Sequence, residues 1–171
     1  MRFTLAVALF CACLTAGAGA ATPGEIEVGG RLRDVPMYGI NGRVQTFAAY
    51  RGKPLVINVW ASWCGPCRAE MGSLERLSRL DQKRQFRVIG VSTDDDAIAA
   101  QTFVVRARLS FDNFVDHNLV LENMLGANTI PLTVLVDADG RVVQKIRGSR
   151  DWTSRASIEL IERAFRLRVA Y

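Results

Sequence analysis

The chain has 171 residues, four cysteines and a formal net charge of +5 at pH 7. A domain of this length can bury its own core, and a scaffold held together by disulfides would need more cysteines for its length. The positive charge gathers near the C-terminal end, in Arg147, Arg150, Arg155, Arg163, Arg166 and Arg168. Such a run is typical of a solvated helix face, with an acidic partner or a membrane surface as the alternative reason for it.

The first residues have the pattern of an export signal. A positive charge at Arg2 precedes an uncharged run over residues 3–16, and Ala18-Gly19-Ala20 forms a small-residue cleavage pattern. We therefore expect residues 1–20 to be removed as a signal peptide, with an uncleaved membrane anchor or a lipid on Cys13 as alternatives. No second long apolar segment follows in the sequence, so membrane contact is expected only through such an anchor.

Removal of the signal leaves an exported domain, residues 21–171, with a single cysteine pair. Cys11 and Cys13 lie inside the signal, whereas Cys64 and Cys67 remain. We therefore expect a periplasmic or otherwise exported protein of one domain, which would not meet nucleic acid.

The first half of this domain alternates strand and helix patterns. Residues 35–47 predict a short hairpin with Asn41-Gly42 as its tight turn, because glycine tolerates a positive φ. Residues 55–61 form an apolar run without alternation, as expected of a strand buried on both faces. Apolar residues then recur at helical spacing to about residue 83, and residues 86–91 predict another buried strand.

An acidic run, Thr93-Asp94-Asp95-Asp96, predicts the start of the next helix. Three adjacent carboxylates resemble a metal site, but at the start of a helix they are more often a cap that complements the helix dipole. The helix is expected to turn Ile98, Phe103 and Val104 towards the core.

The second half of the domain is predicted to end in a hairpin and a helix. Residues 111–115 predict a short strand, residues 118–125 a short helix, and residues 132–147 a hairpin of two strands. An amphipathic helix over residues 153–169 closes the chain, and Trp152 is expected to anchor it. Together these elements predict an α/β sandwich around a mixed sheet.

The sequence Trp63-Cys64-Gly65-Pro66-Cys67 lies where the buried strand at 55–61 ends and a helix begins. Haem attachment would need a histidine in the place of Arg68, and a zinc site would need two further ligands, although the exported domain offers only His117. A structural disulfide here would close a very short loop, which constrains the unfolded chain least. The flanking elements favour the remaining interpretation, a dithiol that exchanges disulfides with no metal or other cofactor.

The position of Cys64 at a helix start indicates how such a pair would work. Backbone N–H groups and the helix dipole there favour the thiolate, and sites of this kind lower a cysteine pKa from about 8.5 to about 7 or below. We expect Cys64 to attack a substrate disulfide and the more buried Cys67 to resolve the mixed disulfide. Gly65 and Pro66 carry no side-chain charge or donor that would stabilise the thiolate further, which favours a reductant over a strong oxidant.

Residues 60–71 resemble the active-site segment of thioredoxin-fold proteins, and they are most similar to the exported TlpA/ResA-type thiol–disulfide oxidoreductases. The segments 90–92 and 129–140 match the same family, and the likeness covers roughly residues 32–165. The resemblance implies a thioredoxin-like sandwich in which helices flank a central mixed sheet, with the hairpin at 35–47 as an N-terminal extension.

The resemblance also implies a cis peptide bond between Ile130 and Pro131, packed beside the disulfide. An X–Pro bond can be cis at low cost, and a proline has no N–H, so substrate backbone can pair beside it. The expected substrate-binding surface comprises Trp63, Gly65, Pro66, Ile130 and Pro131.

Three positions near the motif bear on the family resemblance. Thioredoxins have a buried aspartate where this chain has Asn58, so Cys67 needs another base, and water is one candidate. Glu70 matches a glutamate that is common in the TlpA/ResA group and is the third expected catalytic residue, because partial burial would raise its pKa for proton transfer. An acid that complements the helix dipole is the alternative. Gly72 stands where the family often has proline, and it would loosen the helix locally.

The leading hypothesis is an exported disulfide reductase that delivers electrons to oxidised protein partners, such as apocytochrome c or other envelope proteins. A membrane thiol carrier is the expected electron donor. An oxidase that installs disulfides shares the same chemistry and is the first alternative. A module that handles copper through Cys64 and Cys67 is the alternative outside enzymology, and the missing nearby histidine or methionine ligands argue against it.

Overall fold

The computed structural model describes residues 22–80 and 85–169, so the predicted signal peptide with Cys11 and Cys13 lies outside the described residues. The strands are β1 (Pro36–Gly39), β2 (Val44–Thr46), β3 (Leu55–Trp60), β4 (Arg87–Ser92), β5 (Asp112–Val115), β6 (Leu132–Val136) and β7 (Val142–Arg147). The helices are the 3-10 helix η1 (Phe47–Tyr50), α1 (Gly65–Leu80), α2 (Ala97–Arg106), α3 (Val120–Leu125) and α4 (Arg155–Phe165).

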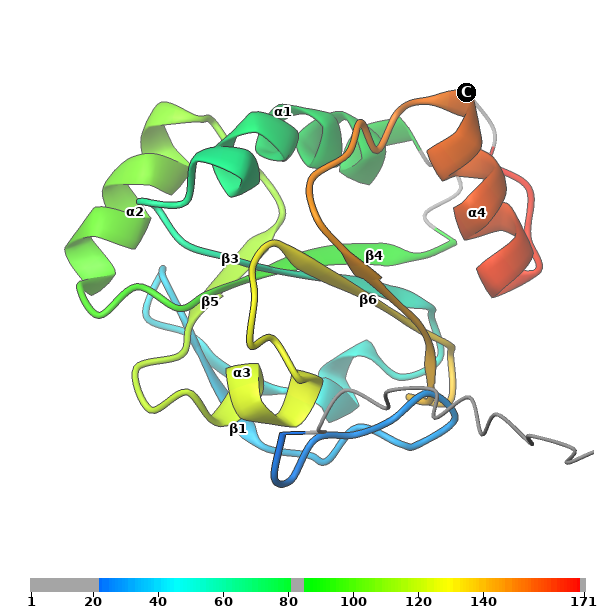
Figure 1. The fold of residues 1–171 in the computed structure, drawn as a ribbon, viewed down its shortest axis with the longest axis horizontal. Helices are drawn as coiled ribbons and strands as arrows, with labels where there is room; N and C mark the ends of the chain where they lie inside the picture. The colour runs from blue at the N-terminus through cyan, green and yellow to red at the C-terminus, as the bar shows by residue number, and fades with distance from the viewer. Residues whose placement is uncertain (1–21, 81–84, 170–171) are drawn as a thin grey trace, which may run out of the picture.

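A mixed seven-stranded sheet in the order β2-β1-β5-β4-β3-β6-β7 forms the middle layer (Figure 1). β3, β4 and β5 are parallel to one another, whereas β6 pairs antiparallel with β3 and with β7. Every residue of β3, an interior strand of the sheet, is buried, as its uninterrupted apolar pattern predicts. The predicted α/β sandwich around a mixed sheet is confirmed.

Helices cover both faces of the sheet, and each face has its own apolar core. Figure 1 shows α1, α2 and α4 on one face and α3 on the other. Leu74 of α1 and Ile161 of α4 belong to the first core, whereas Leu125 of α3 and Phe47 of η1 belong to the second. Because β3 is buried between these two cores, its end and the start of α1 are held in a fixed position at one edge of the sheet.

The predicted N-terminal hairpin is confirmed. β1 pairs antiparallel with β2, and Gly42 in the turn between them has a φ of +82°. β1 also pairs antiparallel with β5, with Tyr38 opposite Val115, so the hairpin extends the sheet beyond β5.

The predicted orientation of Ile98 is wrong, because its side chain is 71% exposed while Ala100 is fully buried. The Asp96 carboxylate accepts the Ile98 N–H at 2.8 Å and caps the start of α2. Since successive helical residues are about 100° apart, burial of Ala100 turns Ile98, two residues earlier, away from the sheet. Phe103 and Val104 do pack against the core, as predicted.

The last helix is shorter than predicted. α4 ends at Phe165 rather than at residue 169, because Arg166 adopts a left-handed conformation with a φ of 53° that closes the helix. The predicted end of the first long helix, near residue 83, lies outside the described residues. Within residues 22–80 and 85–169, no helix combines the length and the apolar character that crossing a membrane would require.

Candidate active site

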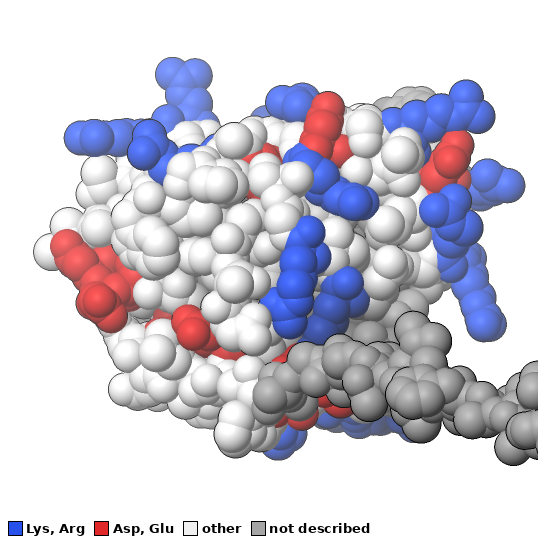
Figure 2. All heavy atoms as spheres, viewed as in Figure 1, with Lys and Arg blue, Asp and Glu red and all other residues white. Residues whose placement is uncertain are grey.

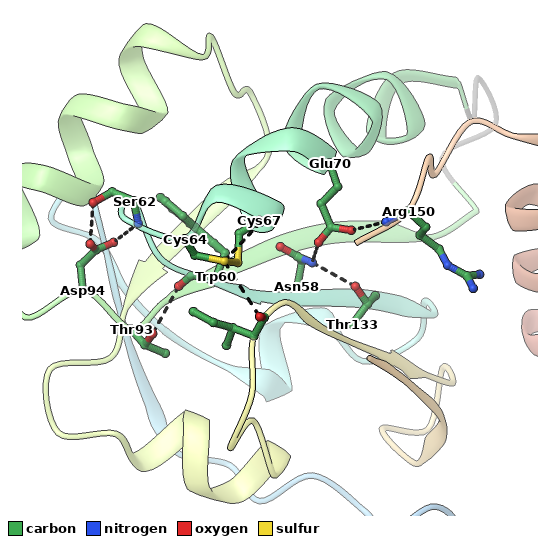
Figure 3. The surroundings of a disulfide bond; sticks show 11 residues. Asn58, Trp60, Ser62, Cys64, Cys67, Glu70, Thr93, Asp94, Thr133 and Arg150 are labelled. Carbon is green, nitrogen blue, oxygen red and sulfur yellow. Dashed lines mark hydrogen bonds between the residues drawn. A yellow bond between two sulfur atoms is a disulfide. The ribbon is translucent and has the colours of Figure 1, made fainter. Parts of the chain in front are cut away.

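Cys64 and Cys67 form a disulfide at the start of α1, just after the end of β3 (Figure 3). The Cys64 N–H donates to the Ala61 carbonyl at 3.1 Å and holds the turn between the two elements. Cys64 Sγ accepts the Cys67 N–H at 3.2 Å, so the helix start can support negative charge on this sulfur. Cys64 is 6% exposed and Cys67 is fully buried, which confirms the predicted order of exposure.

The loop before β6 lies against Cys64. The Ile130–Pro131 peptide bond is cis, as the family resemblance implies, and the Ile130 carbonyl oxygen is 4.0 Å from Cys64 Sγ. The Gly148 N–H donates to the Pro131 carbonyl at 2.9 Å, which ties this loop to the end of β7. A molecule that reaches Cys64 therefore meets the backbone of this loop.

The other residues predicted to bind substrate lie at the surface beside the disulfide. Trp63 is 70% exposed. Gly65 and Pro66 are exposed in the first turn of α1, and Ile130 is half-buried. The Pro131 side chain is buried, so the loop offers its backbone rather than the proline ring.

Glu70 lies on α1 one turn beyond Cys67 and is 2% exposed. Its Oε1 accepts Asn58 Nδ2 at 2.8 Å, and its Oε2 accepts Trp152 Nε1 at 3.0 Å and the Arg150 N–H at 3.1 Å. Burial raises the pKa of the Glu70 carboxyl above its ordinary value, although the donated hydrogen bonds and the Arg150 charge act in the opposite direction. The site thus contains a buried acid that can hold or release a proton.

Trp152 lies in the loop between β7 and α4, and it connects this loop to α1 in addition to anchoring α4. Its indole is fully buried, and its backbone N–H donates to Ser73 Oγ at 3.0 Å. The Arg150 guanidinium carbon lies 5.4 Å from the centre of the indole ring. The Glu70 carboxyl is therefore held by a segment about eighty residues away in the chain, a contact that no local sequence pattern could show.

Asn58 is fully buried on β3 and lies between Cys67 and Glu70 in Figure 3. Its Nδ2 donates to Glu70 Oε1 and to Thr133 Oγ1, the latter at 3.0 Å. Its Oδ1 has no hydrogen-bond partner among the described residues, which is rare for a buried amide. Because an amide does not take a proton, Asn58 orients the Glu70 carboxyl and does not replace the thioredoxin aspartate as a base.

Known proteins resemble this chain in sequence and in fold. The model of the Redoxin family matches residues 27–160. The chain belongs to the Redoxin family. Among curated relatives of this redoxin, the thiol-disulfide oxidoreductase ResA of Geobacillus thermodenitrificans is 29% identical over 124 residues, which are 72% of this chain and 71% of that protein.

Solved structures resemble the redoxin in fold. A crystal structure from Chlorobium tepidum, described as a thiol:disulfide interchange protein DsbE, has a TM-score of 0.75 at 24% identity and covers 82% of this chain and 99% of its own. A secreted disulfide oxidoreductase of Mycobacterium tuberculosis, homologous to E. coli DsbE, has a TM-score of 0.64 at 27% identity, covering 77% and 94%. The predicted thioredoxin-like fold and TlpA/ResA-type resemblance are confirmed. The redoxin is a thiol–disulfide oxidoreductase of the ResA/DsbE type, with Cys64 and Cys67 as its pair.

Sequence reasoning missed a buried carboxylate behind the motif of this redoxin. Asp94 is 3% exposed and accepts the Ser62 N–H at 2.9 Å, the Ser62 hydroxyl at 2.6 Å and the Ser92 hydroxyl at 2.7 Å. Of the acidic run, Asp96 is the residue that caps α2. Within the described part of the chain, no group of three or more histidine, cysteine or acidic residues could hold a metal ion.

The order of the strands indicates the position of Asp94, whereas the acidic run around it in the sequence does not. β3 and β4 are parallel neighbours, so the residues that follow them meet at one edge of the sheet. Ser62 follows β3 and Asp94 follows β4, which brings them together just before Cys64. The carboxylate therefore fixes the segment that leads into the disulfide.

Proposed function

We propose that this redoxin is an exported disulfide reductase that passes an electron pair from Cys64 and Cys67 to disulfides of protein partners. One observation carries the proposal. Cys64 keeps some exposure and its sulfur accepts a backbone hydrogen bond at a helix start, whereas Cys67 is fully buried. Gly65 and Pro66 offer no charged or donor side chain that would stabilise the reduced pair further, and this favours a reductant.

In the proposed cycle, the Cys64 thiolate attacks one sulfur of the substrate disulfide. A mixed disulfide forms while the other substrate sulfur leaves as a thiolate and takes a proton from water. The Cys67 thiol then loses its proton and attacks Cys64 Sγ, which releases the second substrate sulfur. The substrate gains two electrons and two protons, and the pair ends as the disulfide present in the structure.

Glu70 serves the second step of this cycle. Its carboxylate accepts the Cys67 proton and returns it to the departing substrate sulfur. A buried carboxyl whose pKa is raised above its ordinary value suits such proton transfer better than an exposed one. Asn58 and Trp152 hold the two carboxylate oxygens in place through hydrogen bonds of 2.8 Å and 3.0 Å.

The substrate-binding surface in this proposal comprises Trp63, Gly65, Pro66, Ile130 and Pro131. The exposed indole of Trp63 offers apolar contact, and the Ile130 carbonyl beside Cys64 offers an acceptor for substrate backbone. The substrates are disulfides of exported proteins, such as those of apocytochrome c or of other envelope proteins.

Export and a membrane thiol donor complete the proposal. Residues 1–20 have the pattern of a signal, and the M. tuberculosis relative is secreted. In an oxidising compartment the reduced pair must be restored, and a membrane thiol carrier is the class of donor expected there. The protein then contacts the membrane only through this donor and, if the signal is not cleaved, through residues 1–20. The cycle uses no metal, other cofactor or nucleic acid.

The Cys67→Ser variant should trap protein partners as mixed disulfides. Cys64 can still attack, while no thiol remains to resolve the intermediate. In an envelope extract we expect adducts that appear on non-reducing gels and vanish on reduction. Cys64→Ser is the matched control and should trap none, because Cys67 is fully buried. An absence of adducts while Cys64 is still alkylated by iodoacetamide would contradict the proposal.

The reduction potential of the pair decides the direction of electron flow. We expect a value near the roughly −270 mV of thioredoxin, because the residues between the cysteines add nothing that stabilises the thiolate. Equilibration in redox buffers, followed by tryptophan fluorescence, measures it. A value near the roughly −120 mV of DsbA would instead identify an oxidase.

A further inference from the structure

The outer face of α2 exposes more apolar surface than a solvated helix requires. Ile98 and Val105 are 71% and 69% exposed, and they lie seven residues apart, so both project from the same side of the helix. Trp63, beside Cys64, is 70% exposed. These are the three most exposed large apolar side chains among the described residues. Single exposed apolar residues are ordinary on a surface, but Ile98 also lines a groove that reaches the segment before Cys64.

A groove of about 650 Å³ lies between α2 and the segment that leads into the disulfide. Ser62, two residues before Cys64, lines it together with Ile98, Thr102 and Phe103 of α2. Hydrogen bonds from Ser62 to Asp94, at 2.9 Å and 2.6 Å, hold this segment to the loop that begins α2. The groove is therefore a fixed extension of the active site.

Two arginines give the groove positive charge that no described carboxylate pairs with. Arg68, directly after Cys67, and Arg106, at the end of α2, both line it. Among the described residues, neither guanidinium lies within ion-pair distance of a carboxylate. The Arg68 guanidinium lies 5.9 Å from the centre of the Phe103 ring, and this contact stabilises the positive charge at the groove.

Positive charge exceeds negative charge in the groove. Among the described residues that line it, Asp96 is the one acidic side chain, and it lies at the start of α2, where it accepts the Ile98 N–H. Figure 2 shows carboxylates near the start of α2 and cations near its end, with uncharged surface between them. A partner that presents an apolar side chain next to a carboxylate would complement this arrangement.

We infer that this groove docks the segment of a protein partner that flanks its disulfide, and that it selects an apolar side chain beside an acidic one. The inference rests on the proposed function, because it concerns the partners whose disulfides must reach Cys64. Cys64 is only 6% exposed, so its sulfur reacts best with a disulfide that is held in position. A groove that ends two residues before Cys64 provides that hold.

Exchange rates with three disulfides test the inference. Two are synthetic disulfide-linked peptides of equal length, one with Glu-Leu and one with Lys-Leu before its cysteine. The third is hydroxyethyl disulfide, which is small and uncharged. We expect the reduced wild-type protein to react with the acidic peptide about fivefold faster than with the basic one at low salt, and this ratio to fall as salt is added.

Variants at exposed positions locate the effect. Arg106→Glu should abolish or reverse the preference for the acidic peptide. Ile98→Ser removes apolar contact with both peptides, so for each peptide the ratio of its rate to the hydroxyethyl disulfide rate should fall by about threefold. Arg31→Glu and Val28→Ser are the matched controls, since both positions are exposed in the N-terminal segment that packs on the other face of the sheet. They should keep the wild-type ratios, and circular dichroism confirms folding in all four.

Equal wild-type rates for the two peptides, or variants that leave both ratios unchanged, would overturn the docking surface and leave the proposed function standing. A wild-type protein that reduces none of the three disulfides would overturn the proposed function and this inference with it. A dimer in sedimentation experiments that Ile98→Ser dissociates would assign the face to a second copy of the chain, and so would also overturn the inference.

Discussion

Replacing Gly90 with alanine is expected to lower the free energy of unfolding by about 3–5 kcal/mol. Gly90 lies on β4, where an added Cβ would be 2.0 Å from Asn113 Oδ1 and 2.8 Å from Trp60 Nε1. These two atoms form a buried hydrogen bond of 3.1 Å, so the methyl group would have to displace both groups and leave them without a partner. Urea unfolding followed by fluorescence measures the loss.

Gly72→Ala is the matched control and should act in the opposite direction. A Cβ at this position on α1 would meet only the far end of the Arg76 side chain, at 3.7 Å. Alanine favours a helix over glycine by about 1 kcal/mol, so the variant should be more stable by up to that amount. If Gly90→Ala costs less than about 1 kcal/mol, the close approach of β4 to Trp60 does not constrain the fold as we describe.

The same pair of glycines shows what a sequence can reveal. The helix that contains Gly72 follows from apolar residues at helical spacing, and the buried strand β3 follows from an apolar run, because both signals lie within one segment. Nothing near Gly90 in the sequence indicates that Trp60 and Asn113 meet across it. That contact depends on the order of strands in the sheet.

The candidate site divides in the same way. The cysteine pair and the cis Ile130–Pro131 bond were predictable, one from its motif and the other from family resemblance. The Glu70 network was not, since its donors at Arg150 and Trp152 come from the loop before α4. Ile98 was misplaced because the capping residue fixes the rotation of α2, and three adjacent aspartates do not reveal which of them is the cap.

At Glu70, glutamine and leucine variants separate the charge of the side chain from its hydrogen bonds. Glu70→Leu leaves the donors of Asn58, Trp152 and Arg150 without their acceptor, and should lower the free energy of unfolding by about 3 kcal/mol or more. Glu70→Gln keeps one oxygen for Trp152 and Arg150. Its NH₂ group faces Asn58, whose Oδ1 accepts it only if the amide turns and Nδ2 leaves Thr133 Oγ1, so this variant should lose less stability than Glu70→Leu.

The pH dependence of stability then reports the charge alone. Burial raises the pKa of Glu70 in the folded protein, so the folded state holds a proton that the unfolded chain loses near the ordinary value of 4.5. The wild-type protein therefore loses stability as pH rises from about 4.5 to the raised pKa, and the loss stays constant above it. Relative to wild type, Glu70→Gln should gain stability as pH rises through this window.

Glu159→Gln on α4 is the control for this measurement. A hydrogen bond from Arg155 lowers the pKa of Glu159, so its ionised form is favoured by folding. Removing that carboxyl should therefore make the variant less stable relative to wild type as pH rises, which is the opposite sign. Chemical denaturation at several pH values between about 3 and 8 compares the two variants, because the effect of Glu159 falls below its ordinary pKa of 4.5 and that of Glu70 above it.

Exchange kinetics show whether the buried proton also serves the chemistry. If Glu70 accepts the Cys67 proton, Glu70→Gln should slow resolution of a preformed mixed disulfide at Cys64 by about 100-fold, within the usual range for a lost general base. It should also remove one ionisation from the pH profile of that step, because glutamine does not titrate. The initial attack by Cys64 precedes the proton transfer and should slow much less. A glutamine variant that resolves the mixed disulfide at the wild-type rate, with an unchanged pH profile, would restrict Glu70 to holding Asn58 and Trp152 in place.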